Sequence, residues 1–173
     1  IEVNPVVRLH YVEVEEPDLA SPTSDLGRVR DALAREWDLT GLECDAHVLP
    51  GLQKTLRRGN WAVTVAVHDG KAITGVWPGL HETMLGIAFD IGSTTVAGHL
   101  CDLTSGDVLA SAGEMNPQIR FGEDLMSRVS YVMMNPGSEK ELTRAVRGCL
   151  AKLTAELAND AGVSREDILE ITL

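Results

Sequence analysis

The segment Leu85–Thr95 constrains the fold of this chain more than any other, because a hydrophobic strand runs directly into a turn of small polar residues. Leu85–Ile91 has the composition of a β-strand and carries one carboxylate, Asp90, near its end. The next four residues, Gly92–Thr95, are one glycine and three hydroxyl residues. A glycine lets the backbone approach a ligand closely, and turns with free N–H groups bind anions. The segment therefore predicts a strand–turn–strand unit with the groups to hold a phosphate.

A phosphate at this turn would need its charge neutralised and its reacting atoms positioned. The carboxylate of Asp90 can hold Mg²⁺ through water or orient an attacking water. We therefore take Asp90 as the candidate catalytic residue and the candidate metal ligand. The candidate nucleotide-binding residues are Asp90, Gly92, Ser93, Thr94 and Thr95. From these residues alone, an ordinary hairpin turn rich in turn formers remains an alternative.

The segments that follow predict two more strands, joined by short turns into an antiparallel meander. Val96–Cys101 is the second strand, and Asp107–Gly113 is the third. Near the end of the sequence, Ile168–Leu173 has the composition of a further strand. Because the sequence stops inside this apolar strand, we expect the domain to continue beyond it. An exposed edge there favours a homodimer, which the sequence leaves open.

Two helices are expected between the third and the last of these strands. The first spans residues 122–134, and its apolar stripe consists of Leu125, Met126, Val129, Val132 and Met133. We expect Met126, Met133 and Met134 to fill the core rather than to form a binding surface. The second helix has an almost continuous stripe of Leu142, Ala145, Val146, Cys149, Leu150, Leu153 and Leu157. Ser138 and Glu141 have the spacing of a capping box at its start, and Gly162 is placed to end it.

The first half of the chain predicts a small α+β module behind an extended lead-in. Residues 1–23 contain a strand-like stretch bracketed by prolines, which we interpret as a linker lying along another surface. Helices are expected over residues 24–37 and 47–58. Two β-rich runs then flank Asp69-Gly70, a favoured two-residue hairpin turn.

Composition excludes several classes of protein. The 173 residues are 44% hydrophobic and carry a formal net charge of −11 without a basic stripe, so we expect no nucleic-acid partner. No apolar run reaches the roughly 18 residues that span a bilayer, so we expect no membrane contact. Three scattered cysteines, Cys44, Cys101 and Cys149, are typical of buried small hydrophobes in a reducing compartment, so we expect a cytoplasmic location. The five histidines have no metal-ligand spacing.

Two stretches carry a resemblance to known proteins. Residues 85–113 resemble the first phosphate-binding hairpin of the acetate and sugar kinase, heat-shock chaperone and actin (ASKHA) superfamily. The stretch NPQIRFGEDLMSRV, residues 116–129, is more discriminating and resembles the segment after the third strand in reductive activators of corrinoid proteins. Those proteins have a two-iron ferredoxin-like domain, a linker, a middle domain and an actin-like domain.

The resemblance implies a mixed α+β and α/β organisation. It places a linker at 1–23, a small α+β middle domain at 24–82, and the first part of an actin-like (ribonuclease H-like) ATPase subdomain, truncated, at 83–173. Such activators reduce cobalt(II) corrinoid on a methyl-transfer partner to cobalt(I), and ATP drives this uphill step. The parent would thus be an ATP-dependent iron–sulfur reductive activase. Its partner would be a corrinoid protein or a corrinoid-dependent methyltransferase.

Carried over residue by residue, the resemblance implies that Asp90 binds Mg²⁺ or positions a water. It also implies that Gly92–Thr95 contacts the phosphates of ATP. The chain has no run of cysteines, so the two-iron cluster would belong to a parent domain absent from this chain. The second phosphate loop and the adenosine pocket of such folds would also lie beyond residue 173. We therefore expect this fragment by itself to bind nucleotide weakly or not at all.

Several residues keep two interpretations. The first interpretation concerns Asn116, Gln118 and Arg120, which would line the nucleotide cleft or face the partner. In the second interpretation, these residues belong to a loop that only caps the next helix. Asp124 and Arg128 are four residues apart, which favours an ion pair on the helix.

Two other functions remain open for the whole protein. A kinase for a small sugar or carboxylate would share the turn at Gly92–Thr95 but would need neither a cluster domain nor the first module. A non-catalytic interaction module would dock a partner through residues 24–80, and its binding would ignore ATP.

Overall fold

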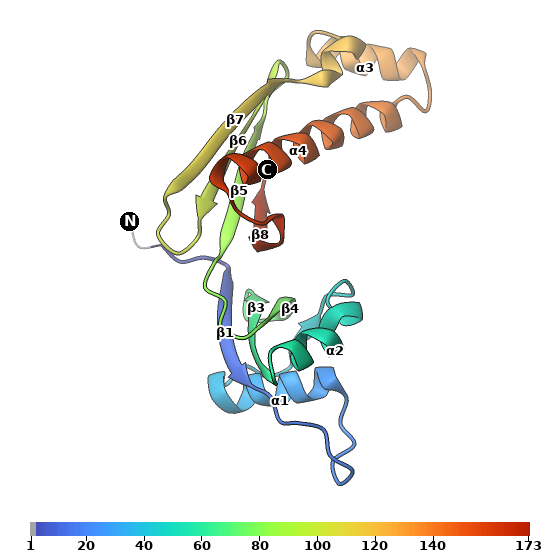
Figure 1. Ribbon diagram of the computed structural model, residues 1–173. Coiled ribbons are helices and arrows are strands. Elements are labelled where there is room, and N and C mark those ends of the chain that lie inside the picture. Colours follow the sequence, from blue (N-terminus) through green and yellow to red (C-terminus); the bar gives the residue numbers. More distant parts are fainter. Residues whose placement is uncertain (1–2) are drawn as a thin grey trace. The chain divides into compact units, whose positions relative to one another are not determined.

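The computed structural model describes residues 3–173, which fall into two units that divide between Met84 and Leu85 (Figure 1). Both units are mixed α+β, which confirms the expected fold class. The elements of the first unit are β1 (Val7–Glu13), α1 (Asp25–Trp37), β2 (Glu43–Cys44), α2 (Leu49–Arg58), β3 (Ala62–His68) and β4 (Ala72–Pro78). Those of the second are β5 (Leu85–Ile91), β6 (Thr95–Asp102), β7 (Val108–Met115), η1 (Pro117–Phe121), α3 (Leu125–Met134), α4 (Glu139–Ala161), η2 (Arg165–Asp167) and β8 (Ile168–Thr172).

The first unit is a sheet of strand order β1-β3-β4-β2 that packs against α1 and α2. Ser24 caps α1 by accepting a hydrogen bond from the backbone N of Gly27, as its position before the helix predicts. Asp69 and Gly70 both have positive φ, at 50° and 66°, and they form the expected hairpin turn between β3 and β4. Leu33, Leu56, Val65 and Ile73 are fully buried at the centre of this core.

The strand-like stretch expected within residues 1–23 is a strand in the structure. Val7–Glu13 is strand β1, which pairs antiparallel with β3 from Val7 opposite His68 to Glu13 opposite Ala62. The free edge of β1 is covered from α1, because Trp37 Nε1 donates to the carbonyl of Tyr11 at 2.8 Å. Edge strands need such cover, since their unpaired backbone groups invite other strands.

The second unit has the strand order β7-β6-β5-β8. β5, β6 and β7 form the predicted antiparallel meander, whereas β8 pairs parallel with β5. A parallel pair requires a long crossover between its strands, and the segment containing η1, α3 and α4 supplies it. This arrangement agrees with the start of an actin-like subdomain.

The core of the second unit lies between α4 and one face of the sheet (Figure 1). The predicted stripe of α4 supplies Leu153 and Leu157, both fully buried, and β5 supplies Ile87 and Phe89. Gly162 ends α4 in the left-handed conformation, with φ 67° and ψ 32°, as predicted.

A glycine on β6 makes the close packing of this core possible. A Cβ at Gly98 would lie 2.7 Å from Cε1 of Phe89 and 3.1 Å from Cδ1 of Leu157.

We expect Gly98→Ala to lower the free energy of unfolding by about 1–3 kcal/mol, because overpacking forces side chains and backbone to shift. Gly148→Ala is the control, since nothing lies within 4 Å of a Cβ there and alanine favours a helix by about 1 kcal/mol. Urea denaturation followed by circular dichroism measures the free energy of unfolding of both variants. A Gly98→Ala variant as stable as the wild type would show that the core has room for a methyl group at this position.

Two expectations about the helices are wrong. The stripe of α3 is largely exposed, and Leu125, Met126, Met133 and Met134 each have between 68% and 76% of their surface in solvent. The capping box at α4 does not form, because Ser138 already has helical dihedrals and its side chain makes no capping hydrogen bond. The backbone N of Glu141 donates instead to the main-chain oxygen of Ser138 at 2.9 Å.

Among residues 3–173, no helix is both long enough and apolar enough to cross a membrane.

Candidate functional site

Asp90 lies on the face of the second sheet that α4 does not cover. Successive side chains of a strand point to opposite faces. Phe89 therefore packs in the core and is 6% exposed, whereas Asp90 is exposed to solvent. Its neighbour in the sheet is Ala97 of β6, a small residue that leaves the carboxylate open. The structure thus places the candidate carboxylate where a ligand can reach it.

The turn from β5 to β6, residues Gly92–Thr95, follows directly. It is closed by a hydrogen bond of 2.9 Å from the backbone N of Gly92 to the carbonyl of Thr95. A Cβ on Gly92 would lie 2.9 Å from that same oxygen, so a larger residue would force the backbone apart. The side chains of Ser93, Thr94 and Thr95 are exposed. The hydroxyl groups therefore surround a tight turn and remain free for a ligand.

Asn116 fastens the turn from inside the unit. Its side chain is 1% exposed, and its Nδ2 donates to the carbonyl of Gly92 at 2.8 Å. Its backbone N donates to the carbonyl of Thr94 at 2.7 Å. Its Oδ1 accepts from the backbone N of Gln118 at 2.9 Å and so caps η1. Asn116 therefore caps the helix that follows it, and it also holds the turn from the buried side.

Gln118 and Arg120 point to different surroundings. Gln118 Nε2 donates to the carbonyl of Leu142 in α4 at 3.0 Å, and its Oε1 accepts from Arg128 at 3.4 Å. Arg120 is exposed, and its guanidinium lies 4.6 Å from the centre of the Phe121 ring. Gln118 thus supports the turn indirectly, whereas Arg120 stacks on its neighbour.

Arg128 is the residue of this site that sequence reasoning missed. It is 6% exposed, although arginine is rarely buried without partners. Its Nη2 donates to the carbonyl of Ser93 in the turn, and its Nε donates to the carbonyl of Gly122 at 2.9 Å. The expected helix ion pair is therefore not its main role. The spacing from Asp124 could not reveal a contact with a residue 35 positions away.

Asp124 caps α3. Its Oδ1 accepts from both the backbone N and the Oγ of Ser127 at 2.7 Å. These hydrogen bonds, the backbone one first, lower the pKa of the Asp124 carboxyl from its ordinary value. Because the pKa is lowered, the ionised cap stabilises the fold at pH values above the ordinary pKa of a carboxyl group. This stabilisation is lost as the pH falls through the lowered pKa.

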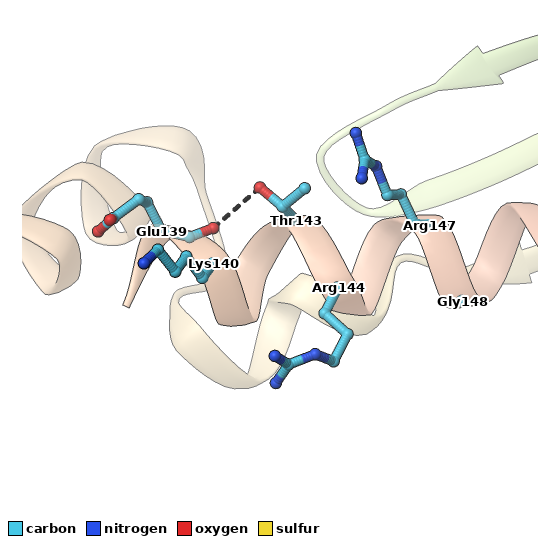
Figure 2. A pocket seen from close by; sticks show the side chains of 6 residues that line it. All are labelled: Glu139, Lys140, Thr143, Arg144, Arg147 and Gly148. Atoms are coloured by element: carbon cyan, nitrogen blue, oxygen red, sulfur yellow. Dashed lines mark hydrogen bonds between the residues drawn. The ribbon is translucent and has the colours of Figure 1, made fainter. Parts of the chain in front are cut away.

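The first half of α4 carries a hollow in its surface that does not include the turn. Its lining residues all come from α4 and are Glu139, Lys140, Thr143, Arg144, Arg147 and Gly148. Figure 2 shows that the side chains of Arg144 and Arg147 point away from each other, so they do not converge on one anion. Thr143 Oγ1 donates to the carbonyl of Glu139 at 2.9 Å within the helix. We regard this hollow as a basic stretch of helix surface.

The residues present fit one implied cofactor and not the other. Mg²⁺ is commonly held by one or two carboxylates together with substrate phosphates, which suits an exposed Asp90 beside the turn. Within residues 3–173 there is no group of three or more His, Cys, Asp or Glu side chains that could hold a metal ion. Cys44 lies in the first unit, whereas Cys101 and Cys149 lie on separate elements of the second. These cysteines do not fit a two-iron cluster.

Comparison with known proteins identifies the family. A family model described as the RACo linker region matches residues 1–83, and one described as the RACo middle region matches residues 85–173. The chain belongs to the RACo family. This confirms the resemblance to reductive activators of corrinoid proteins. The RACo models apply the terms linker and middle region to the two units, whereas the sequence suggested a middle domain followed by the start of an actin-like domain.

Two individual RACo-like proteins support this assignment. A protein named corrinoid activation enzyme RamQ, from Eubacterium limosum, is 39% identical over 89 residues, which are 51% of this chain and 15% of that protein. A solved structure named reductive activator for corrinoid, iron-sulfur protein, matches 99% of this chain with a TM-score of 0.78 and 33% identity. The match spans 28% of that structure's chain. This chain thus spans less than a third of the length of either relative.

Proposed function

We propose that this chain is part of an ATP-dependent reductive activator that converts cobalt(II) corrinoid on a partner protein to cobalt(I). The family match and the names of the two relatives support a role in corrinoid activation. The observation that carries the ATP dependence is the exposed carboxylate of Asp90 beside a turn whose carbonyls are held from inside. A turn held in this way can bind phosphate without paying for its own ordering.

In this proposal, the residues of this chain bind and orient the nucleotide. The hydroxyl groups of Ser93, Thr94 and Thr95 donate hydrogen bonds to phosphate oxygens. The carboxylate of Asp90 holds the water shell of Mg²⁺ or orients a water. Bound Mg²⁺ supplies charge neutralisation for the phosphates. The electron for cobalt comes from outside this chain, because its cysteines do not form a cluster site within the described residues.

The test is an absorption experiment on the intact protein with a corrinoid protein as partner. Under a chemical reductant, we expect the cobalt(II) spectrum to convert to that of cobalt(I) only when Mg-ATP is present. Conversion at the same rate without ATP would contradict the ATP dependence. Phosphate transfer to a sugar or a carboxylate would support the kinase instead, and partner binding that ignores ATP would support an interaction module.

A further inference from the structure

We propose that Arg128 is a positioning residue that orients the backbone N–H groups of the Gly92–Thr95 turn toward a bound phosphate. Three successive carbonyls of this turn accept hydrogen bonds from inside the unit. The carbonyl of Gly92 accepts from Asn116 Nδ2, that of Ser93 accepts from Arg128 Nη2, and that of Thr94 accepts from Asn116 N. The inference rests on the proposed function, since it concerns how the same turn would bind ATP.

The direction of the three carbonyls determines the direction of three N–H groups. A trans peptide is planar, so its C=O and its N–H point in opposite directions. The described part of the chain contains no cis peptide. Since the carbonyls of Gly92, Ser93 and Thr94 point toward Asn116 and Arg128, the N–H groups of the next residue in each case point the other way. Successive N–H groups on one side of a turn form a concave anion site.

Arg128 holds the middle of these three peptides, and its position is itself well determined. Its Nε bonds the carbonyl of Gly122, and its Nη1 bonds Gln118. A Cβ on Gly122 would lie 2.7 Å from the backbone N of Arg128, so only glycine allows α3 to start this close. The acceptors named here are two main-chain carbonyls and one side-chain amide.

The chemistry of arginine suits this position better than that of lysine. A guanidinium presents five N–H donors in a fixed plane and can serve three acceptors at once, whereas an ammonium is a compact point charge on a flexible stem. Arg128→Lys keeps the charge but cannot make the three hydrogen bonds at once. If these hydrogen bonds orient the turn, Arg128→Lys and Arg128→Gln should both weaken the binding of phosphate by the turn.

The first readout uses the intact protein without nucleotide. The amides of Gly92 and Asn116 are held by the hydrogen bonds that close and fasten the turn. We expect their hydrogen exchange to become at least about tenfold faster in Arg128→Lys and in Arg128→Gln, because a lost charge-assisted hydrogen bond is worth about that factor. Arg147→Gln on the exposed face of α4 is the matched control and should leave both rates unchanged. Unchanged rates in the Arg128 variants would overturn the proposal.

The second readout separates positioning from a merely structural role. In ATP-dependent corrinoid reduction, we expect both Arg128 variants to raise the KM for ATP by about 10- to 100-fold and to change kcat by less than about threefold, since contacts to bound phosphate are lost in ground and transition state alike. If Arg128 only stabilised the fold, its variants would contain less folded protein, but the folded molecules would keep the wild-type KM for ATP. An unchanged KM in the Arg128 variants would therefore overturn the proposal. A wild-type protein indifferent to ATP would defeat the proposed function, while the exchange rates measured without nucleotide would still decide whether Arg128 holds the turn.

Discussion

If the proposed function holds, we expect the replacement of Asp90 by alanine to lower the ATP-stimulated rate of corrinoid reduction by about 100-fold, the order of loss that follows when reacting groups are misplaced by about 1 Å. The reason is geometric. Asp90 is the carboxylate that β5 delivers to the open face of the sheet beside the Gly92–Thr95 turn. Without it, Mg²⁺ or the attacking water would lose its anchor while the turn itself stays intact. We therefore expect kcat to fall more than the KM for ATP rises.

The controls for Asp90 separate charge from fold. Asp90→Asn keeps the size of the side chain and removes its charge, so we expect it to behave like Asp90→Ala. Asp107→Ala removes an exposed carboxylate from the turn between β6 and β7 and should leave the rate within twofold of wild type, as is usual for surface sites. The measurement is the initial rate of cobalt(I) formation, followed by absorption at saturating Mg-ATP. An Asp90→Ala protein with wild-type kinetics would exclude this carboxylate from the mechanism.

We expect the replacement of Leu153 by alanine to destabilise the second unit by about 2–5 kcal/mol, the general range for a buried leucine replaced by alanine. Leu153 is fully buried where α4 packs on the sheet. The loss combines the transfer energy of the missing methyl groups with the cavity they leave. Since the same core supports β5, this change should also loosen the strand that carries Asp90.

Amide exchange under native conditions measures this effect in the unit where it arises. We expect the exchange free energies of amides in β5 and β6 to fall by the same few kcal/mol. Leu19→Ala is the matched control, because Leu19 is fully exposed and its truncation should change stability by less than about 0.5 kcal/mol. A loss below about 1 kcal/mol for Leu153→Ala would mean that the core collapses around the missing side chain.

The parts of the fold that local signals encode were predicted from the sequence. Ser24 lies at the start of α1, and Asp69-Gly70 forms the hairpin turn because both residues tolerate positive φ. The apolar stripe of α4 predicted which face of that helix is buried, and Gly162 predicted its end. Each of these features depends on residues that are neighbours in the chain or one helical turn apart. Local dihedral preferences and periodicity therefore sufficed.

Features that depend on distant partners were not predicted. The strand-like stretch that forms β1 pairs with β3, from Val7 opposite His68 to Glu13 opposite Ala62, and nothing near β1 in the sequence shows that pairing. The stripe of α3 looks like a core stripe, yet its side chains are exposed because no described element covers that face. Ser138 and Glu141 have capping-box spacing, but the backbone at Ser138 is already helical.

The sequence by itself determined the candidate site as a pattern: a hydrophobic strand with Asp90 near its end, followed by a turn of one glycine and three hydroxyl residues. Only the tertiary structure decided how that turn is held. Asn116 and Arg128 reach it from 24 and 35 residues away and hold successive carbonyls from inside the unit. Hydrogen bonds over such separations form only when the sheet and helices have packed. They follow from the fold as a whole, and no spacing along the chain encodes them.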